Sequence, residues 1–520
     1  MENIFQYLNS SSSSRFIPMF LIVILLISPF AAYSDQKTDN KPATFDRFSG
    51  IKYYIQNIMK STRTPSISVA VAQEGKIVWE ESFGWANREK QIKAIPQTIY
   101  SLASTSKPMT ATAMMILVER GLIDLNEPVN SYLGDSRLTA YEGNAADATI
   151  ARLMHHTAGL PTIWNFYFDG AQINRPHLPE SIKQYGILTS PPGTVYEYSN
   201  LGYGIAEYII ERVSGKSFAQ FIKSEVFEPL GMHQSFVATE IFQYDSIAAR
   251  YIENKNASPF FEVMSSGGGG ICASVHDLLL FGMFHLKNHL PDQKKILSDS
   301  TIDYMQSCVD PLVPDSPYKL GWDVKEMFGY RVVNHGGGMP GVSSALLLVP
   351  SENIAIAILC NGTYIDLYKK IGYRILARML PEKKGKQKTI PKKNETGDLN
   401  VQFPSQKYVG QWDGEIKTDK DHIPVSLDID ETGKVTLTLI DEGRKCLPVE
   451  TFRYNNGTLR GSFDFDIPTK DASVCRHKVY MSLKLYDNRL SGYAAAVSYR
   501  VEVFHLPYYI EFEKRSNSYK

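Results

Sequence analysis

The sequence Ser104-Thr105-Ser106-Lys107 stands at the start of a helix-forming run that continues from Met109 to Arg120 and closes at Gly121. The run is apolar nearly all round, so it predicts a buried helix whose first turn is held rigidly. A serine and a lysine at this spacing share one face of a helix, where the amine can activate the hydroxyl as a nucleophile. The alternative interpretation is an N-cap serine followed by a solvated lysine.

The same Ser-x-x-Lys pattern recurs at Ser34–Lys37, Ser49–Lys52 and Ser316–Lys319, so it is weak evidence by itself. The first of these straddles an expected cleavage site, and a glycine lies inside the second. In the third, a proline directly after the serine disfavours helical backbone there. Only Ser104 is followed by a long helix-forming run.

A second candidate is Tyr198-Ser199-Asn200, which follows the turn-forming stretch 190–194. A phenol normally titrates near pH 10. Beside an ammonium such as Lys107 its anion is favoured, and it can then take the proton of a serine hydroxyl. Asn200 carries both a donor and an acceptor, which suit a substrate amide. The alternative is a tyrosine and an asparagine in an ordinary turn.

A third candidate is the stretch Asn334-His335-Gly336-Gly337-Gly338-Met339-Pro340-Gly341, which leads into a predicted strand at 344–349. Glycines let the backbone approach a ligand closely, and strand-edge N–H groups can bind a developing oxyanion. His335 would add a donor and, when protonated, a positive charge. A glycine-rich turn with a surface histidine is the alternative.

The bulk composition limits the function classes. A chain of 520 residues is too long for one ordinary core and predicts two or three domains. Its 55 basic and 55 acidic residues balance, so nothing favours nucleic acid as a partner. The Lys-rich stretch at 381–401 is interpreted as a solvated linker.

His155 and His156 have no partner at ligand spacing, and no G-x-S-x-G elbow occurs. We therefore expect no metal, no cofactor and no α/β-hydrolase.

The N-terminus has the pattern of a targeting segment. A basic residue precedes the apolar run from Phe16 to Ile27, and the small residues Ala32 and Ser34 suit a signal peptidase. The apolar run is short for a membrane span. We expect residues 1–34 to be a signal peptide and the protein to be periplasmic or secreted, with an uncleaved membrane anchor as the alternative.

Five cysteines in so long a chain do not make a disulfide framework, even in an exported protein. Cys272, Cys308 and Cys360 lie among apolar neighbours and are expected to behave as small core residues. Cys446 and Cys475 both lie in the C-terminal region and could pair, which the sequence leaves open.

The order of the predicted elements indicates the fold of residues 40–380. Short strands are predicted at 65–72 and 76–80, helical patterns dominate the middle, and strands return at 330–333, 344–349 and 354–359. Strands at both ends with helices between them predict an α/β (α+β) domain. In it, a mixed sheet is flanked by helices, and a helical region is inserted.

From about Gln402 the sequence pattern changes to an alternation of apolar and polar residues. Val425, Leu427 and Ile429 interleave with polar residues, and similar period-two stretches follow, separated by turns. This predicts a small all-β barrel domain at 402–515. No cluster in it resembles a catalytic site.

The three candidates together resemble the signature elements of the serine β-lactamase and penicillin-recognising hydrolases. Similar flanking stretches occur at 150–161, 192–194, 229–232 and 267–271, so the likeness extends from near Asp46 to Leu380. It is to the branch that contains class C β-lactamases, D-alanyl-D-alanine carboxypeptidases, D-aminopeptidases and esterases. It implies a β-lactamase/transpeptidase-like fold. The C-terminal region, opening with 408–412, is similar to the lipocalin-like barrels appended to some of these hydrolases.

The resemblance implies a two-step acyl transfer in which a serine attacks a carbonyl. The residues it assigns to catalysis are Ser104, Lys107 and Tyr198, and those it assigns to the oxyanion and the substrate are Asn200, His335, Gly336, Gly337 and Gly338. Tyr198 is the expected base, and the N–H groups of Ser104 and Gly338 the expected oxyanion hole. Asn200 would orient the substrate amide, and His335 would face its carboxylate end.

One departure from the family pattern bears on the substrate. Class C β-lactamases carry lysine where this chain has His335, and histidine is mostly neutral at pH 7. The hold on a substrate carboxylate should therefore be weaker, and potent β-lactamase activity is not expected. A histidine here resembles the carboxypeptidase, aminopeptidase and esterase members, which implies a small amide, peptide or ester as the substrate. The alternatives are a binder or sensor that acylates without turnover, a weak class C-type β-lactamase, and an inactive scaffold. The loop region 164–184, the role of the barrel and the oligomeric state stay open.

Overall fold

The computed structural model describes residues 46–170, 173–238, 247–363, 366–383, 406–440, 445–455, 457–499 and 502–515. The expected signal peptide at 1–34 and most of the expected linker at 381–401 lie outside these residues. In the part of the chain that is described, no helix is both long enough and apolar enough to cross a membrane.

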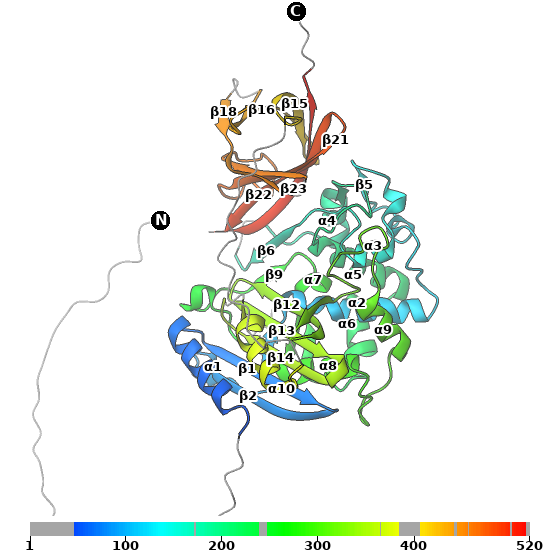
Figure 1. Ribbon diagram of the computed structural model, residues 1–520, viewed down its shortest axis with the longest axis vertical. Helices are drawn as coiled ribbons and strands as arrows, with labels where there is room; N and C mark the ends of the chain where they lie inside the picture. Colours follow the sequence, from blue (N-terminus) through cyan, green and yellow to red (C-terminus); the bar gives the residue numbers. More distant parts are fainter. Residues whose placement is uncertain are drawn as a thin grey trace, which may run out of the picture. The chain divides into compact units, whose positions relative to one another are not determined.

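A seven-stranded antiparallel sheet forms the centre of the N-terminal domain (Figure 1). In spatial order its strands are β11 (Asp323–Met327), β12 (Tyr330–Met339), β13 (Val342–Val349), β14 (Ile354–Cys360), β1 (Ser66–Gln73), β2 (Lys76–Asn87) and β3 (Ile92–Lys93). β1 pairs with β14, so the strands predicted at the two ends of the domain meet in one sheet, as expected.

Helices cover both faces of this sheet. On one face α1 (Ser49–Thr62) and α10 (Tyr373–Met379) pack against β1, β13 and β14 through a cluster that includes Ile55, Leu347 and Ile375. The other face carries α8 (Val275–His285) and α2 (Lys107–Glu119). Because side chains alternate along a strand, Leu346 and Leu348 point to this second cluster.

The remaining elements of the N-terminal domain form the inserted helical region and its borders. They are β4 (Ile99–Ser101), β5 (Thr139–Ala140), α3 (Ile150–Met154), β6 (Trp164–Phe168), α4 (Leu178–Tyr185), β7 (Ile187–Leu188), α5 (Asn200–Ser214), α6 (Phe218–Ile222), β8 (Ser235–Val237), β9 (Phe261–Val263), α7 (Ser266–Gly269), β10 (Ile271–Ser274) and α9 (Asp299–Ser307). The helical patterns predicted for the middle of this domain correspond to elements such as α5 and α6, which a π-helical turn follows.

The C-terminal domain is a half-barrel of antiparallel strands, which confirms the all-β prediction. In pairing order its strands are β18 (Lys445–Pro448), β17 (Val435–Leu439), β16 (His422–Ile429), β15 (Gly410–Lys417), β23 (Val503–Lys514), β22 (Arg489–Tyr499), β21 (Lys478–Tyr486), β20 (Thr458–Phe463) and β19 (Glu450–Asn455). Val425, Leu427 and Ile429 are buried and alternate with more exposed neighbours, as the period-two pattern predicts.

The sheet of the half-barrel continues into the N-terminal domain. β6 pairs with the first residues of β23, with Phe166 opposite Val503 and Trp164 opposite His505, and β9 pairs with β6 in turn. The region at 164–184 was expected to be a loop, and part of it is instead a strand. From Arg47 onward the chain groups as one compact unit.

Polar contacts join the two domains beside this strand pairing. Glu142, which is 5% exposed, accepts a hydrogen bond of 2.6 Å from Tyr509 and pairs with Arg489 at 2.7 Å. The hydroxyl of Tyr185 donates to Asp471.

The two C-terminal cysteines contact other side chains and not each other. Cys446 lies 3.5 Å from the Thr438 hydroxyl, and Cys475 lies 3.4 Å from the Ser498 hydroxyl. The disulfide that the sequence left open is therefore not formed.

Candidate active site

Ser104 and Lys107 meet at the start of α2. A 3₁₀ turn from Ala103 to Ser106 precedes the α-helix, so the predicted first turn is tighter than an α-helical one. In a 3₁₀ turn, side chains three residues apart are eclipsed. The Lys107 amine accordingly lies 3.2 Å from the Ser104 hydroxyl oxygen.

The turn that carries Ser104 is fixed by its neighbours. The Ser344 hydroxyl on β13 donates to the Leu102 carbonyl at 2.5 Å and lies 2.7 Å from the Thr105 hydroxyl. Ala103, directly before the nucleophile, has a φ of 48°. An alanine in this left-handed region is strained by about 1–3 kcal/mol and persists only where the surrounding structure imposes it.

Lys107 is fully buried, and its three hydrogen-bond partners are neutral. Its amine lies 2.8 Å from Asn200 Oδ1, 2.7 Å from the Gly268 carbonyl and 3.2 Å from Ser104 Oγ. Burial holds the pKa of this amine well below its ordinary 10.5. A neutral amine has two N–H donors and one lone pair. The amide and carbonyl oxygens can only accept, so they take two N–H groups of the amine. The third position faces the Ser104 hydroxyl oxygen, as an N–H donor in the ammonium form and as a lone pair in the neutral form.

Tyr198 reaches Ser104 from the loop before α5. Ser104 is close enough to the Tyr198 hydroxyl to affect its pKa, and the Lys107 amine lies 4.8 Å from the centre of its ring. Burial raises the pKa of Tyr198 above its ordinary value of 10. The phenolate expected beside an ammonium is therefore disfavoured, because burial favours a neutral amine and a neutral phenol.

Asn200 is the first residue of α5, whose N-cap Ser199 accepts a hydrogen bond from Gly202 N–H. Its Oδ1 accepts from Lys107, and its Nδ2 donates to the Ile163 carbonyl at 2.9 Å. Both ends of this amide are thus engaged in positioning the Lys107 amine, whereas the sequence predicted a role in orienting the substrate.

His335 is buried and both of its ring nitrogens are engaged. Nδ1 lies 2.9 Å from the Gly336 carbonyl, which can only accept, so Nδ1 carries the proton. Nε2 then accepts from the Tyr318 hydroxyl at 2.9 Å. Burial, with a smaller contribution from Lys107, lowers the pKa of His335 to about 3. The imidazole is neutral, and this gives it no charge with which to hold a substrate carboxylate.

The three glycines after His335 continue β12 as a strand rather than forming a turn. At Gly337 an added Cβ would lie 2.2 Å from the Leu102 carbonyl and 3.1 Å from the Ser104 nitrogen, so only glycine allows this approach. At Gly338 the same position is open. β12 therefore runs close beside the Ser104 backbone, which is the arrangement the predicted oxyanion hole requires.

A buried carboxyl lies behind the Lys107 amine. Glu207 on α5 accepts a hydrogen bond of 2.8 Å from Gly267 N–H at the start of α7, and the next residue, Gly268, supplies the carbonyl that binds Lys107. Burial raises the pKa of Glu207 to about 7, against the opposing effects of Arg175 and the Gly267 N–H. Glu207 thereby helps to fix the acceptor of the amine.

Ser104 opens into a cavity of about 960 Å³. Asn200 and Gly338 border the cavity near the nucleophile. Its outer wall is formed by Trp164, Phe166 and Phe168 of β6 together with Tyr499 and Val503 of the half-barrel.

The sequence did not identify several of these neighbours. His156, for which the sequence indicated no metal partner, accepts a hydrogen bond from Ser199 N–H at 3.1 Å, and its ring centre lies 4.4 Å from that of Tyr198. Tyr318 lies within a Ser-x-x-Lys match that was set aside. A glutamate inside an otherwise apolar helix stripe is the one local signal that could have indicated Glu207.

Comparison with known proteins identifies the family. A family model described as Beta-lactamase matches residues 51–378, well over half of the chain. The chain belongs to the β-lactamase family. Within that family it is a hydrolase of the serine type, which agrees with the resemblance drawn from the three motifs.

Individual relatives are distant. The chain is 27% identical over 323 residues to a protein of Aspergillus campestris named Unguisins hydrolase, a match that covers 58% of this chain and 60% of that one. The chain thus spans less than two thirds of that relative's length. An octameric penicillin-binding protein homologue from Pyrococcus abyssi is similar in structure, with a TM-score of 0.56 and 22% identity, over 89% of this chain and 99% of that chain. A class C β-lactamase has a TM-score of 0.55 and 20% identity, over 65% and 97%. These structures show the fold alone.

Proposed function

We propose that this member of the β-lactamase family hydrolyses a small amide, peptide or ester through an acyl-enzyme on Ser104. The observation that supports the proposal most strongly is the hydrogen bonding of Lys107. Two acceptor-only oxygens orient the amine, and its remaining position faces the Ser104 hydroxyl at 3.2 Å. This is the arrangement of a nucleophile with its general base.

In the first step Ser104 Oγ attacks the substrate carbonyl carbon while its proton moves to the Lys107 amine. The negative charge on the carbonyl oxygen is stabilised by the N–H groups of Ser104 and Gly338. When the tetrahedral intermediate collapses, the bond to the leaving group breaks, and the leaving group takes a proton from Tyr198 or Lys107. The acyl group stays on Ser104.

In the second step a water molecule attacks the acyl carbon. The neutral Lys107 amine, or Tyr198 after it has lost its proton, accepts the proton from water. Ser104 then leaves as an alkoxide, takes that proton back, and the acid product departs. In the starting state burial favours Lys107 over Tyr198 as the base, because it lowers the pKa of the amine and raises that of the phenol.

The test is turnover of a chromogenic ester, p-nitrophenyl acetate, by the purified protein and by Ser104→Ala. Ser49→Ala is the matched control, because Ser49 belongs to another Ser-x-x-Lys match and lies exposed at the start of α1. We expect Ser104→Ala to abolish turnover and Ser49→Ala to leave it unchanged. Undiminished turnover in Ser104→Ala would refute the proposal.

The main competing function is a binder or sensor that is acylated without turnover. Mass spectrometry after brief exposure to penicillin distinguishes the two, because a long-lived adduct favours the sensor and a transient one the hydrolase. That the Aspergillus relative is named a hydrolase supports turnover.

We also propose that the protein is exported, on the strength of the apolar run from Phe16 to Ile27 and the small residues that follow it. N-terminal sequencing of the protein recovered outside the cytoplasm should begin close to Asp35. A chain that retains its first residues in the membrane fraction would instead support the anchor.

A further inference from the structure

We infer that the half-barrel completes the substrate site and makes it selective for uncharged, bulky apolar acyl groups. This inference rests on the proposed hydrolysis at Ser104 and concerns the substrate class of that same site. It gives the C-terminal domain a direct part in substrate recognition.

The first observation is the apolar character of the cavity beyond Ser104. Phe166 and Phe168 of β6 pack on the buried Phe261 of β9, with ring centres 5.2 Å and 5.0 Å apart. Met339 and Val342 belong to the same buried cluster. A cavity of about 960 Å³ with such a wall is large enough for a ligand well beyond the size of an acetyl group.

The second observation is that the C-terminal domain supplies part of this wall. Val503 pairs directly opposite Phe166, so both side chains stand on the same face of the joined sheet. Tyr499, at the end of β22, lies 6.4 Å from Trp164 between ring centres and is 65% exposed. An exposed aromatic side chain that borders a substrate cavity gains burial when an apolar ligand binds.

The third observation concerns charge. The amine of Lys107 is engaged by Asn200 and Gly268, and the imidazole of His335 is neutral with both nitrogens bonded. Among the described residues that line the cavity, the charged ones are Glu253 and Lys255, which pair with each other at 2.7 Å on the exposed rim. A substrate carboxylate would therefore lose water in the cavity without gaining a cation.

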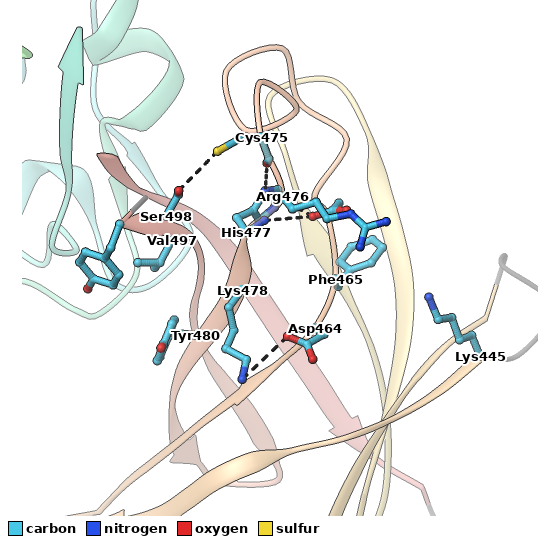
Figure 2. Close-up of a pocket in the computed structure, with 12 residues that line it drawn as sticks. Lys445, Asp464, Phe465, Cys475, Arg476, His477, Lys478, Tyr480, Val497 and Ser498 are labelled. Carbon is cyan, nitrogen blue, oxygen red and sulfur yellow. Dashed lines mark hydrogen bonds and ion pairs between the residues drawn. The ribbon is translucent and has the colours of Figure 1, made fainter. Parts of the chain in front are cut away.

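A second hollow, on the half-barrel itself, provides a contrast (Figure 2). Its volume is about 940 Å³, and charged side chains line it, among them Asp464, Arg476 and Lys478. Among the described residues, Tyr499 lines both the cavity at Ser104 and the charged hollow. Of these two, Tyr480 of β21 lines only the charged hollow. The two tyrosines thus form a matched pair for mutagenesis, since both are exposed side chains of the same domain.

The experiment compares kcat/KM for three p-nitrophenyl esters: the acetate, the octanoate, and the hemisuberate, whose acyl chain ends in a carboxylate. The full-length protein should prefer the octanoate to both others by about tenfold or more, as expected when several methylene groups enter an apolar cavity. Preference for the hemisuberate over the octanoate would overturn the inference.

Variants separate the half-barrel from the catalytic residues. Tyr499→Ala should lower kcat/KM for the octanoate by about tenfold more than for the acetate. Tyr499→Phe should keep the octanoate-to-acetate ratio, because the ring remains, and Tyr480→Ala should behave like the unmodified protein. An unchanged octanoate-to-acetate ratio in Tyr499→Ala would overturn the inference while leaving the proposed hydrolysis intact. Acetate turnover that persists in Ser104→Ala would instead refute the proposed function, and the inference with it.

Discussion

The nucleophile corner and the outer wall of the same cavity are built in opposite ways. In the corner, Ser104, Lys107 and Tyr198 come from two segments of one domain, and the Lys107 amine makes three hydrogen bonds to oxygen atoms. In the wall, Phe166 and Val503 come from two domains and pair through their backbones. Their apolar side chains line the cavity.

This difference separates reactivity from selectivity. Burial without a compensating charge lowers the pKa of the Lys107 amine, which favours the neutral form that can accept a proton. The wall adds no proton chemistry, but it decides which acyl group is brought to Ser104. Changes in the corner should therefore affect every substrate alike, and changes in the wall should affect only bulky ones.

The largest expected effect comes from removing the base in the corner. Lys107→Met should lower kcat for p-nitrophenyl acetate and for the octanoate equally, by roughly three decades, because no amine remains to accept the proton. In the native enzyme kcat/KM should rise with pH as the amine loses its proton, with a midpoint below the ordinary 10.5. The control is Lys52→Met in the Ser49–Lys52 match, where the lysine pairs with Glu81 at the surface. Unequal losses for the two esters would contradict the separation of reactivity from selectivity.

Tyr198→Phe tests the second polar partner of the nucleophile. The ring and its packing on His156 remain, while the hydroxyl near Ser104 is lost. We expect kcat to fall by about two decades on both esters, with KM little changed. A loss confined to KM would show that Tyr198 only packs against the substrate.

Glu207→Gln tests, through the pH dependence of stability, the buried carboxyl that binds Gly267 N–H next to the Lys107 amine. The folded-state pKa of about 7 lies above the ordinary 4.5, so the folded protein keeps a proton that the unfolded chain releases. Stability should therefore fall as the pH rises from about 4.5 to about 7 and stay low above it, by on the order of 3 kcal/mol in total.

In Glu207→Gln this fall should disappear from urea unfolding curves measured across that range. The same substitution at Glu228, which is exposed and pairs only weakly with Lys223, should leave the fall in place. If both variants keep the native pH dependence, Glu207 does not carry the proton.

The smallest expected effect comes from loosening the junction between the domains. Glu142→Gln weakens the pair with Arg489 and the bond from Tyr509. Because Arg489 is about one third exposed, we expect a loss of only about 1–2 kcal/mol in unfolding free energy. Octanoate turnover should fall more than acetate turnover. Glu431→Gln, in an exposed turn of the half-barrel, is the control.

The parts of this molecule that could be predicted from the sequence are those encoded locally. The helix after Ser104, the strands at 344–349 and 354–359 and the period-two strands of the half-barrel all have the expected character. The three motifs also come together around Ser104, as their joint resemblance to the family implied.

What could not be predicted depends on partners far away in the chain. Trp164 pairs with His505, and no local pattern in β6 indicates that it pairs with a strand of the other domain. The protonation state of Lys107 and His335 depends on burial, which follows only from the folded arrangement. The expectation of a phenolate at Tyr198 did not include that burial, whereas the neutral His335 expected at pH 7 agrees with it.

The most direct test of the account is to locate the acyl group during turnover. The protein is mixed with p-nitrophenyl octanoate, quenched in acid within one turnover, digested and examined by mass spectrometry. The account predicts one octanoyl group on the peptide that contains Ser104, and none in Ser104→Ala. An octanoyl group on another residue, or turnover with no acylated peptide at any time, would contradict it.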